Sequence, residues 1–307
     1  MRFARPHWVM IVAILLWLGA SLPAFSAEVV VRVPTGALPA DFFDRLPEGV
    51  RHNAALRADL QALLTGYAGS CQGLALAENN RLYLIMKDNV RILYDDGKVK
   101  SFEEKLDHPD LEDMLSQVYP AGEFKEYKAD YDPGRFRVTA FFNSVYGGTS
   151  KQVQANLTTV NFCGQKVQFS ARNGAAAALG RVGQNLAALI KGKPELRQYL
   201  FPLGGSVNWR SIAGTNRPSP HSWGIAFDLN PRHGAYWRWQ KKPTAASILN
   251  LRQSYPQEIV KIFEAQGFIW GGKWSHYDFM HFEYRPELLA KTPTAIPANT
   301  KEPSKVF

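Results

Sequence analysis

The chain has 307 residues, of which 46% are hydrophobic and 12% aromatic. This composition is that of a globular protein with a sizeable core, and the length allows one large domain or two smaller ones. The formal net charge of +9 favours an anionic polymer such as a cell wall, or a membrane surface, as a partner. A generally basic surface explains the charge equally well.

Residues 1–26 have the features of a secretory signal peptide. Arg2 and Arg5 give the charged start, residues 8–18 the apolar stretch, and residues 24–26 a small-x-small cleavage pattern. An uncleaved membrane anchor is the alternative, but the apolar stretch is short for a membrane span. We therefore expect an exported protein, periplasmic or associated with the cell envelope, with no stable membrane span after cleavage. Export argues against nucleic acid as a partner, and no basic-aromatic motif favours one.

The two cysteines, Cys71 and Cys163, are expected to form a disulfide if the protein is exported, because oxidising compartments favour disulfides. Two buried thiols are the alternative. Both residues precede the motif described below, so a bridge between them is expected to be structural.

Residues 27–200 form a mixed α and β region in which the sequence indicates no chemistry. Asn53 is expected to cap a helix that ends at Gly66. The remaining apolar patterns predict, in chain order, strands at 82–86 and 90–94, a helix at 109–118, strands at 135–142 and 152–169, and a helix at 174–191.

Residues 201–290 are denser in Trp, Gly and His and form the second expected domain. Pro256 begins a helix that Gly267 ends, and residues 268–270 then form a strand. Residues 291–307 contain mainly Lys, Thr and Pro and are expected to be a disordered tail.

The second domain contains His221 and Asp228, seven residues apart, and about fifty residues later Asp278 and His281. Two imidazoles and one carboxylate can hold one Zn²⁺, and a catalytic zinc keeps three protein ligands and one open position. A structural zinc more often has four ligands rich in cysteine, and both cysteines lie far from this region. His221, Asp228 and His281 are therefore the predicted ligands of a catalytic zinc.

The spacing requires the chain to fold back between His221 and Asp228. Seven residues span roughly 23 Å as a strand and about 10.5 Å as a helix, whereas metal–ligand bonds are about 2 Å long. Gly224 permits a tight turn, and residues 225–227 then read as a short buried strand.

Two acidic residues flank the third ligand. Asp278 and His281, three apart, project to one side of a helical or turn-like segment, so Asp278 is predicted to activate water as the general base. Glu283 competes for that role, but we favour it as the group that orients a ligand histidine. If residues 281–283 form a strand, His281 and Glu283 point to the same face.

Two arginines just before His221 are candidates for contact with a substrate. A fixed guanidinium near the metal stabilises an oxyanion, and we prefer Arg210 for that role and Arg217 for substrate binding. A surface position or a carboxylate partner is the alternative for each. Ser219 either hydrogen-bonds a substrate or shapes the turn. The tryptophans of this region are expected to be core more often than walls of a groove; they are Trp223, Trp237, Trp239, Trp270 and Trp274.

At these residues the sequence resembles the D-alanyl-D-alanine carboxypeptidase family of zinc peptidases, which includes the VanY-like vancomycin-resistance enzymes and phage endolysins that cut L-alanyl-D-glutamate bonds. The resemblance covers about residues 200–290. The family pattern Ser-x-His-x-x-Gly-x-Ala-x-Asp is met by Ser219, His221, Gly224, Ala226 and Asp228. Its second half, an acidic residue separated by two places from His-Phe-Glu, is met by Asp278, His281, Phe282 and Glu283.

The resemblance implies an α+β fold, with a small antiparallel sheet and flanking helices in residues 201–290. It also implies zinc on His221, Asp228 and His281, with Asp278 as base and Arg210 as oxyanion partner. The carboxypeptidase branch is expected to carry Glu where this chain has Asp278, and the aspartate is more similar to the endopeptidase branch.

Three functions follow from these observations. The first is an exported zinc metallopeptidase that hydrolyses peptidoglycan stem peptides, as a D-Ala-D-Ala carboxypeptidase or an L-Ala-D-Glu endopeptidase. The second is a non-catalytic cell-wall-binding module that retains the zinc fold. The third is a zinc hydrolase acting on another amide. The presence of Asp278 favours the first, because a binding module needs no base beside the metal.

Overall fold

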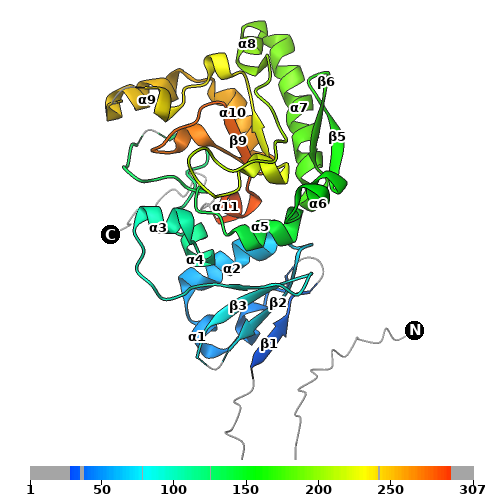
Figure 1. The fold of residues 1–307 in the computed structure, drawn as a ribbon, viewed down its shortest axis with the longest axis vertical. Helices are drawn as coiled ribbons and strands as arrows, with labels where there is room; N and C mark the ends of the chain where they lie inside the picture. The colour runs from blue at the N-terminus through cyan, green and yellow to red at the C-terminus, as the bar shows by residue number, and fades with distance from the viewer. Residues whose placement is uncertain (1–27, 35–37, 78, 125, 241–242, 292–307) are drawn as a thin grey trace, which may run out of the picture.

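The computed structural model describes residues 28–34, 38–77, 79–124, 126–240 and 243–291. The expected signal peptide (1–26) lies outside these residues, as does the expected tail after Lys291. No helix in the described part of the chain has the length and hydrophobicity needed to span a membrane. Figure 1 shows one sheet at the lower end of the molecule and the C-terminal strands, with their helices, in the upper part.

The first sheet is antiparallel, with strands in the order β1-β2-β3-β4. These strands are β1 (Val29–Arg32), β2 (Cys71–Leu76), β3 (Leu82–Met86) and β4 (Arg91–Leu93). Two short helical segments, η1 (Phe43–Arg45) and α1 (Glu48–Arg51), precede α2 (Ala54–Gly66). The Asn53 side chain accepts a hydrogen bond from the Leu56 amide at 3.0 Å, so the predicted cap and helix are confirmed.

The segment after the first sheet is more helical than expected. It forms α3 (Phe102–Asp107), α4 (Leu111–Leu115), α5 (Thr139–Tyr146) and α6 (Ser150–Ala155). The predicted helix at 109–118 is present but shorter, because Asp110 caps it. The strand predicted at 135–142 is wrong. Its aromatic residues continue the helical pattern of α5, in which Phe141, Phe142 and Val145 are buried.

An antiparallel hairpin of β5 (Leu157–Phe162) and β6 (Gln165–Ser170) precedes the long helix α7 (Ala175–Gly192). The strand predicted at 152–169 is therefore confirmed from Leu157 onward, while its first residues belong to α6. The helix predicted at 174–191 is confirmed. A Cβ at Gly183 would lie 2.9 Å from the Asn161 carbonyl oxygen, so this glycine lets α7 pack closely on β5.

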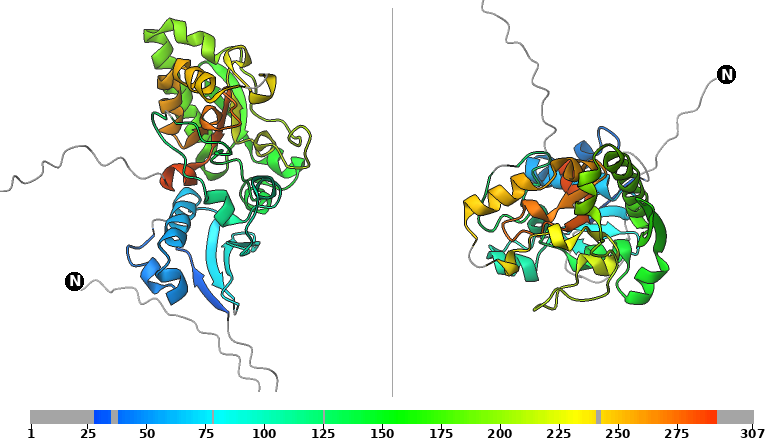
Figure 2. Two further views of the ribbon diagram at one scale, coloured as in Figure 1. Left: turned by 90° about the vertical axis from the view of Figure 1, so that its left-hand side faces the viewer. Right: turned by 90° about the horizontal axis from the view of Figure 1, so that it is seen from above.

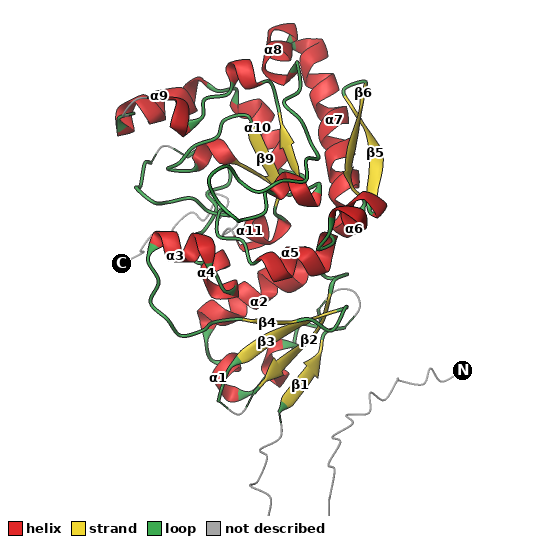
Figure 3. Cartoon of the chain, viewed as in Figure 1, coloured by secondary structure: helices red, strands yellow, loops and turns green. Residues whose placement is uncertain are grey.

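The C-terminal part contains a three-stranded antiparallel sheet in the order β7-β9-β8. Its strands are β7 (Ala226–Asp228), β8 (Phe268–Trp270) and β9 (His281–Tyr284), accompanied by α8 (Arg197–Leu200), α9 (Ala245–Ser254), α10 (Gln257–Glu264) and α11 (Pro286–Lys291). The predicted strands at 225–227 and 268–270 and the helix after Pro256 are confirmed to within a few residues. Small antiparallel sheets combined with helices, as Figure 3 shows, make this an α+β fold, as expected.

One continuous cluster of buried hydrophobic side chains runs from Val33 in the N-terminal part to Leu288 in α11. Helix α11 packs against α2, and Figure 2 shows the two helices next to each other. The Tyr67 hydroxyl donates to the Glu287 carboxylate at 2.9 Å across this contact. The hairpin also joins the C-terminal core, since the Phe162 and Phe227 rings lie 4.6 Å apart. Residues before 200 therefore support the C-terminal sheet directly.

Both cysteines are free thiols, so the expected disulfide is absent and the alternative of two thiols holds. Cys71 lies in β2 of the first sheet, whereas Cys163 occupies the β5–β6 turn, where its Sγ contacts the Gly183 carbonyl oxygen at 3.2 Å. Because the two residues lie in separate sheets, no bridge joins them. Burial raises the pKa of Cys71 to about 12 and that of Cys163 to about 11.

Candidate metal centre

The three predicted ligands come from a short helical turn and two paired strands. His221 lies in the 3₁₀ turn η4 (Pro220–Trp223), Asp228 ends β7 and His281 begins β9. Gly224, with φ of +67°, reverses the chain after His221. The register of the β7–β9 pair then places Asp228 directly opposite His281. The predicted fold-back is confirmed.

The ligand atoms converge on one point. The Nε2 of His221 lies 3.2 Å from one Asp228 carboxylate oxygen, and the Nδ1 of His281 lies 2.9 Å from the other. All three ligand atoms are within 4.8 Å of one another. Tetrahedral bonds of about 2.1 Å separate ligand atoms by about 3.4 Å. The donor set and its spacing therefore fit a divalent metal ion.

Each ligand imidazole has one nitrogen directed at the shared point and a second nitrogen that contacts another group of the protein. The second contact determines which nitrogen is available to the metal. The Nδ1 of His221 contacts the Ser206 carbonyl oxygen at 2.7 Å, which leaves Nε2 free as a ligand. The Nε2 of His281 faces the Glu283 carboxylate at 3.7 Å, which leaves Nδ1 as the ligand. Metal-binding histidines characteristically have such a partner for the second nitrogen.

The electrostatics of the site favour a bound cation. Burial opposes ionisation of Asp228, but the hydrogen bonds and charges of His221 and His281 outweigh it and hold its pKa below the usual range. Burial also opposes protonation of His281, yet Asp228 and Glu283 raise its pKa to about 10. A proton on His281 faces Asp228, and a metal ion competes with this proton for the same place.

Asp278 is a further carboxylate close enough to the three ligand residues for their charges to act on it. Its Oδ1 is buried and makes no hydrogen bond with any described residue. Burial raises its pKa to about 6, while the charges of His281 and His221 act in the opposite direction. Its main chain is fixed by a hydrogen bond from its amide to the Gly271 carbonyl oxygen at 3.0 Å. Asp278 thus has a fixed main chain and a buried carboxylate oxygen that is available for a proton.

Glu283 belongs to a chain of buried charges behind His281. Because β9 is a strand, Glu283 and His281 point to the same face, as expected. Arg137 donates two hydrogen bonds to Glu283, at 2.8 and 2.5 Å. Arg285 lies 3.4 Å from Glu283 and 2.5 Å from Glu287. The Arg137 charge and hydrogen bonds outweigh burial and hold the pKa of Glu283 below its usual range.

The remaining predicted site residues lie outside the ligand set. Arg210 is exposed, and its side chain donates to the Ser211 carbonyl oxygen at 3.4 Å. Ser219 is buried and caps η4, accepting from the His221 amide at 3.4 Å, a contact that supports the turn. Arg217 lines a cavity, with its Nε 3.5 Å from the Asp107 carboxylate. The structure thus brings the three ligands, Asp278 and Glu283 together and leaves the Arg210 side chain in solvent.

The tryptophans divide into two groups. Trp223, Trp270 and Trp274 are buried in the core, as expected for most of the tryptophans of this region. Trp239 is 63% exposed and Trp237 is half-buried, so these two belong to the surface.

Two other groups of acidic residues in the described chain have metal-ligand spacing. Asp110 belongs to both groups and Asp113 to one of them. The Lys100 ammonium forms ion pairs with Asp110 at 2.8 Å and with Asp113 at 2.6 Å. The lysine already supplies the positive charge there, so the His-Asp-His group is the stronger candidate.

Comparison with protein families agrees with this geometry. Residues 213–284 match the D-alanyl-D-alanine carboxypeptidase family model. The resemblance inferred from the sequence motifs is therefore confirmed over this segment, which contains all three ligands, Asp278 and Glu283. The match makes this segment similar to the peptidases of that family. Searches of curated proteins and of solved structures give no match.

Sequence reasoning missed the residues that support the site from outside the matched segment. Arg137 and Asp132 precede that segment by about eighty residues, and the sequence pattern predicts a strand over the stretch that contains Arg137. Asp132 accepts hydrogen bonds from the His276 amide at 2.9 Å and from Arg135 at 2.7 Å, and its carboxylate contacts the His276 ring at 2.7 Å. The alternation of charged and apolar residues in Arg135-Phe136-Arg137 is the sequence feature that could have indicated a row of charged side chains here.

Proposed function

We propose that the protein is an exported zinc metallopeptidase that hydrolyses peptide bonds in peptidoglycan stem peptides. One observation carries the proposal: three ligand atoms lie within 4.8 Å of one another, next to a buried carboxylate oxygen that has no hydrogen-bond partner among the described residues. A site that only holds a metal has no use for that oxygen. The match of residues 213–284 to a peptidase family supports the same function.

His221, Asp228 and His281 are the proposed zinc ligands. Zinc at such a site lowers the pKa of water and polarises a carbonyl group. The chain's own contribution is to present three ligands and hold their orientation. The Ser206 carbonyl and Glu283 fix the two imidazoles, so both ligand nitrogens keep their lone pairs directed at one point.

Asp278 is the proposed general base. Burial raises its pKa to about 6, which is close to neutral pH, where a general base is most effective. It accepts the proton of the attacking water and then delivers that proton to the leaving amine. Arg210 remains the proposed partner of the oxyanion, and its exposed side chain must turn toward the site when substrate binds. Ser219 and Arg217 are proposed to contact the substrate.

We further propose that residues 201–290 form the peptidase domain, that residues 1–26 are a cleaved signal peptide, and that the mature protein acts in the periplasm or cell envelope. Removal of Arg2 and Arg5 with the signal peptide leaves a formal net charge of +7 (34 basic minus 27 acidic residues), which suits an anionic cell wall. The proposal covers both a D-Ala-D-Ala carboxypeptidase and an L-Ala-D-Glu endopeptidase.

The alternative function, a non-catalytic cell-wall-binding module, is favoured by two exposed aromatic side chains. Trp209 is 47% exposed and Trp239 is 63% exposed, and exposed aromatic rings can bind sugars or peptides.

Digestion of muropeptides, followed by mass spectrometry of the products, tests the proposal. Zinc-loaded wild type is compared with chelator-treated protein, with Asp278→Asn and with a matched control, Asp44→Asn, whose carboxylate is exposed in η1. We expect products only from the zinc-loaded wild type and the control. Digestion that survives both chelation and Asp278→Asn contradicts the mechanism. Binding to cell walls without any product supports the module instead. The mass of the released fragment distinguishes the two cleavage types.

A further inference from the structure

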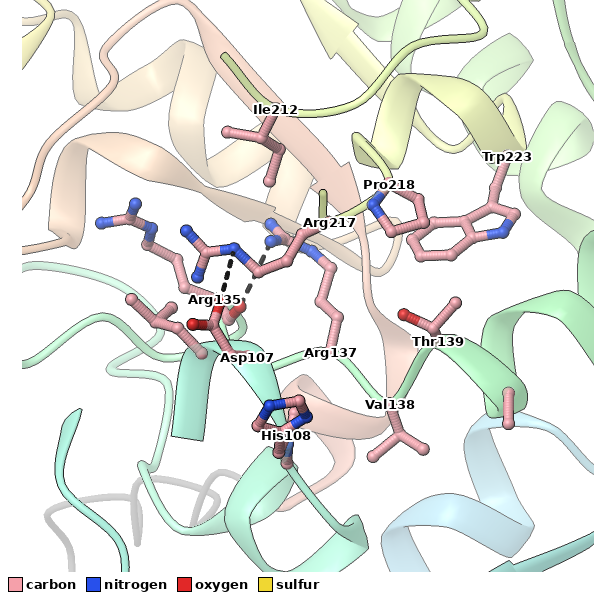
Figure 4. A pocket seen from close by; sticks show the side chains of 13 residues that line it. Asp107, His108, Arg135, Arg137, Val138, Thr139, Ile212, Arg217, Pro218 and Trp223 are labelled. Atoms are coloured by element: carbon pink, nitrogen blue, oxygen red, sulfur yellow. Dashed lines mark hydrogen bonds and ion pairs between the residues drawn. The ribbon is translucent and has the colours of Figure 1, made fainter. Parts of the chain in front are cut away.

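A cavity of about 250 Å³ lies between α3, the start of α5 and the segment that precedes His221. Its lining includes three arginines, Arg135, Arg137 and Arg217. Figure 4 shows their guanidinium groups in a row between Ile212 and Asp107. Asp107 is the one acidic side chain among the lining residues. The cavity is therefore strongly basic.

Two of these arginines are held in place by buried carboxylates. Arg137 is bound to Glu283, whose side chain is 0% exposed, and Arg135 donates to Asp132, whose side chain is also 0% exposed. Each of these carboxylates is shared with a second basic group, since Arg285 contacts Glu283 and His276 contacts Asp132. The acids thus fix Arg135 and Arg137 in place, and among the lining cations that leaves Arg217 without a buried carboxylate partner.

Arg217 is poorly paired. Its Nε is buried and makes no hydrogen bond with any described residue, and the Asp107 carboxylate lies 3.5 Å away. The Asp107 side chain is 57% exposed, so this ion pair contributes little. Burial lowers the pKa of Arg217, and the charges of Arg135 and Arg137 lower it further. An anion that reaches this guanidinium relieves both effects.

Two connections link the cavity to the metal centre, the turn η4 and the side chain of Arg137. Pro218 and Trp223, which line it, are the near neighbours of His221 in the chain. Arg137 lines it as well, and the carboxylate that Arg137 binds faces the ring of His281. The cavity thus shares the turn η4 and the Arg137–Glu283–His281 contacts with the metal centre.

We propose that Arg217, supported by Arg135 and Arg137, forms a subsite that binds a free carboxylate of the peptide substrate. The identification of the ligand as a peptide rests on the proposed function. The guanidinium fork matches a planar carboxylate, and a cavity of about 250 Å³ holds one small side chain or chain end. Arg135 and Arg137 lie outside the segment that matches the peptidase family, so this subsite is a feature of the N-terminal part of the chain.

A stem peptide offers two sources for such a carboxylate, its C-terminus and the glutamate residue within it. The probe is a synthetic stem pentapeptide, L-Ala-D-Glu-L-Lys-D-Ala-D-Ala, with two analogues. One analogue carries a C-terminal amide and the other an amide at the free carboxyl group of glutamate. Binding is measured by calorimetry on zinc-loaded Asp278→Asn protein, which keeps the proposed ligands and does not turn the peptide over.

Two substitutions in this background change the affinity in opposite directions. Arg217→Met is expected to weaken binding of the parent peptide about tenfold or more, because a charge-assisted pair is lost. Asp107→Asn is expected to strengthen it, because a competing carboxylate is removed. The matched control is Arg181→Met, since Arg181 is exposed on α7 and bonded to Gln266. An effect of Asp107→Asn cannot come from misfolding, because it is a gain.

The source of the carboxylate is the group whose amidation weakens binding to the zinc-loaded Asp278→Asn protein. Binding of that amidated peptide should then not change further when Arg217→Met is added. Equal binding of all three peptides, no binding of any, or an Arg217→Met effect no larger than that of the control overturns the subsite. Digestion by the wild type separates the two proposals. Cleavage without any dependence on Arg217 leaves the peptidase and removes the subsite, whereas carboxylate-dependent binding without cleavage leaves the subsite and removes the peptidase.

Discussion

The Nε2 of His281 lies 3.7 Å from a carboxylate oxygen of Glu283, on the same face of β9. Glu283 is in turn fixed by two hydrogen bonds from Arg137, a residue 146 positions earlier in the chain. The orientation of a candidate metal ligand therefore depends on a side chain far from the matched peptidase segment.

Replacing Glu283 by glutamine tests this dependence. The amide cannot balance Arg137 and Arg285, so the free energy of unfolding is expected to fall by about 3–5 kcal/mol. Loss of the partner of His281 is expected to weaken zinc binding about 10–100-fold. Chemical denaturation and competition with a chromophoric chelator measure the two effects. The matched control is Glu258→Gln, whose carboxylate is exposed and paired with Lys193. Zinc affinity equal to that of the wild type contradicts the orienting role.

Asp278→Asn is expected to separate stability from catalysis. The Oδ1 atom has no hydrogen-bond partner among the described residues, so neutralising the carboxylate removes a buried charge without breaking a pair. Thermal unfolding should show a melting temperature at or above that of the wild type, while kcat falls by about 10²–10⁴-fold. A large loss of stability, with kcat reduced only in proportion to the folded fraction, argues against a role as base.

The activity of the zinc-loaded protein is expected to fall in mildly acidic solution. Burial raises the pKa of Asp278 to about 6, and the base must be ionised, so kcat/KM rises with pH through this value. A bound cation lowers this pKa, which places the acidic limb at or below about 6. Zinc content must be followed in parallel, because protons compete for His281, whose pKa is about 10 without the metal. A profile that is flat through this range while zinc stays bound contradicts the assignment.

Both thiols are expected to be free and slow to react in the folded protein. Burial raises the pKa of Cys71 to about 12 and that of Cys163 to about 11, so little thiolate forms at neutral pH. Titration with a thiol reagent, without prior reduction, should detect both thiols after denaturation and far fewer before it. Reductant should leave the melting temperature unchanged. If no thiols are detected in denatured, unreduced protein, the two cysteines form a disulfide and this prediction is wrong.

The centre of the candidate site was predictable because short, local patterns encode it. Gly224, the two histidines and the two aspartates lie in segments whose turn and strand could be read from neighbouring residues, and β7 and β9 bring them together. The strand at 268–270 and the helix after Pro256 were predictable for the same reason.

The support of the site was not predictable, because it depends on contacts between distant parts of the chain. Arg137, Asp132 and Tyr67 meet their partners more than a hundred residues away. Their roles follow from packing, which leaves no periodic mark. The segment containing Phe141 and Phe142 also showed how aromatic residues favour a strand in isolation, whereas burial against the core stabilises a helix.

The order of strands in the C-terminal sheet has a consequence for the newly made chain. β9 is the last strand to be synthesised, yet it lies between β7 and β8. Until it emerges, the two outer strands have no partner in this sheet and Asp228 lacks the imidazole opposite it. A truncated or half-made polypeptide without β9 therefore cannot assemble the His-Asp-His group, so the proposed activity can arise only once β9 has been made.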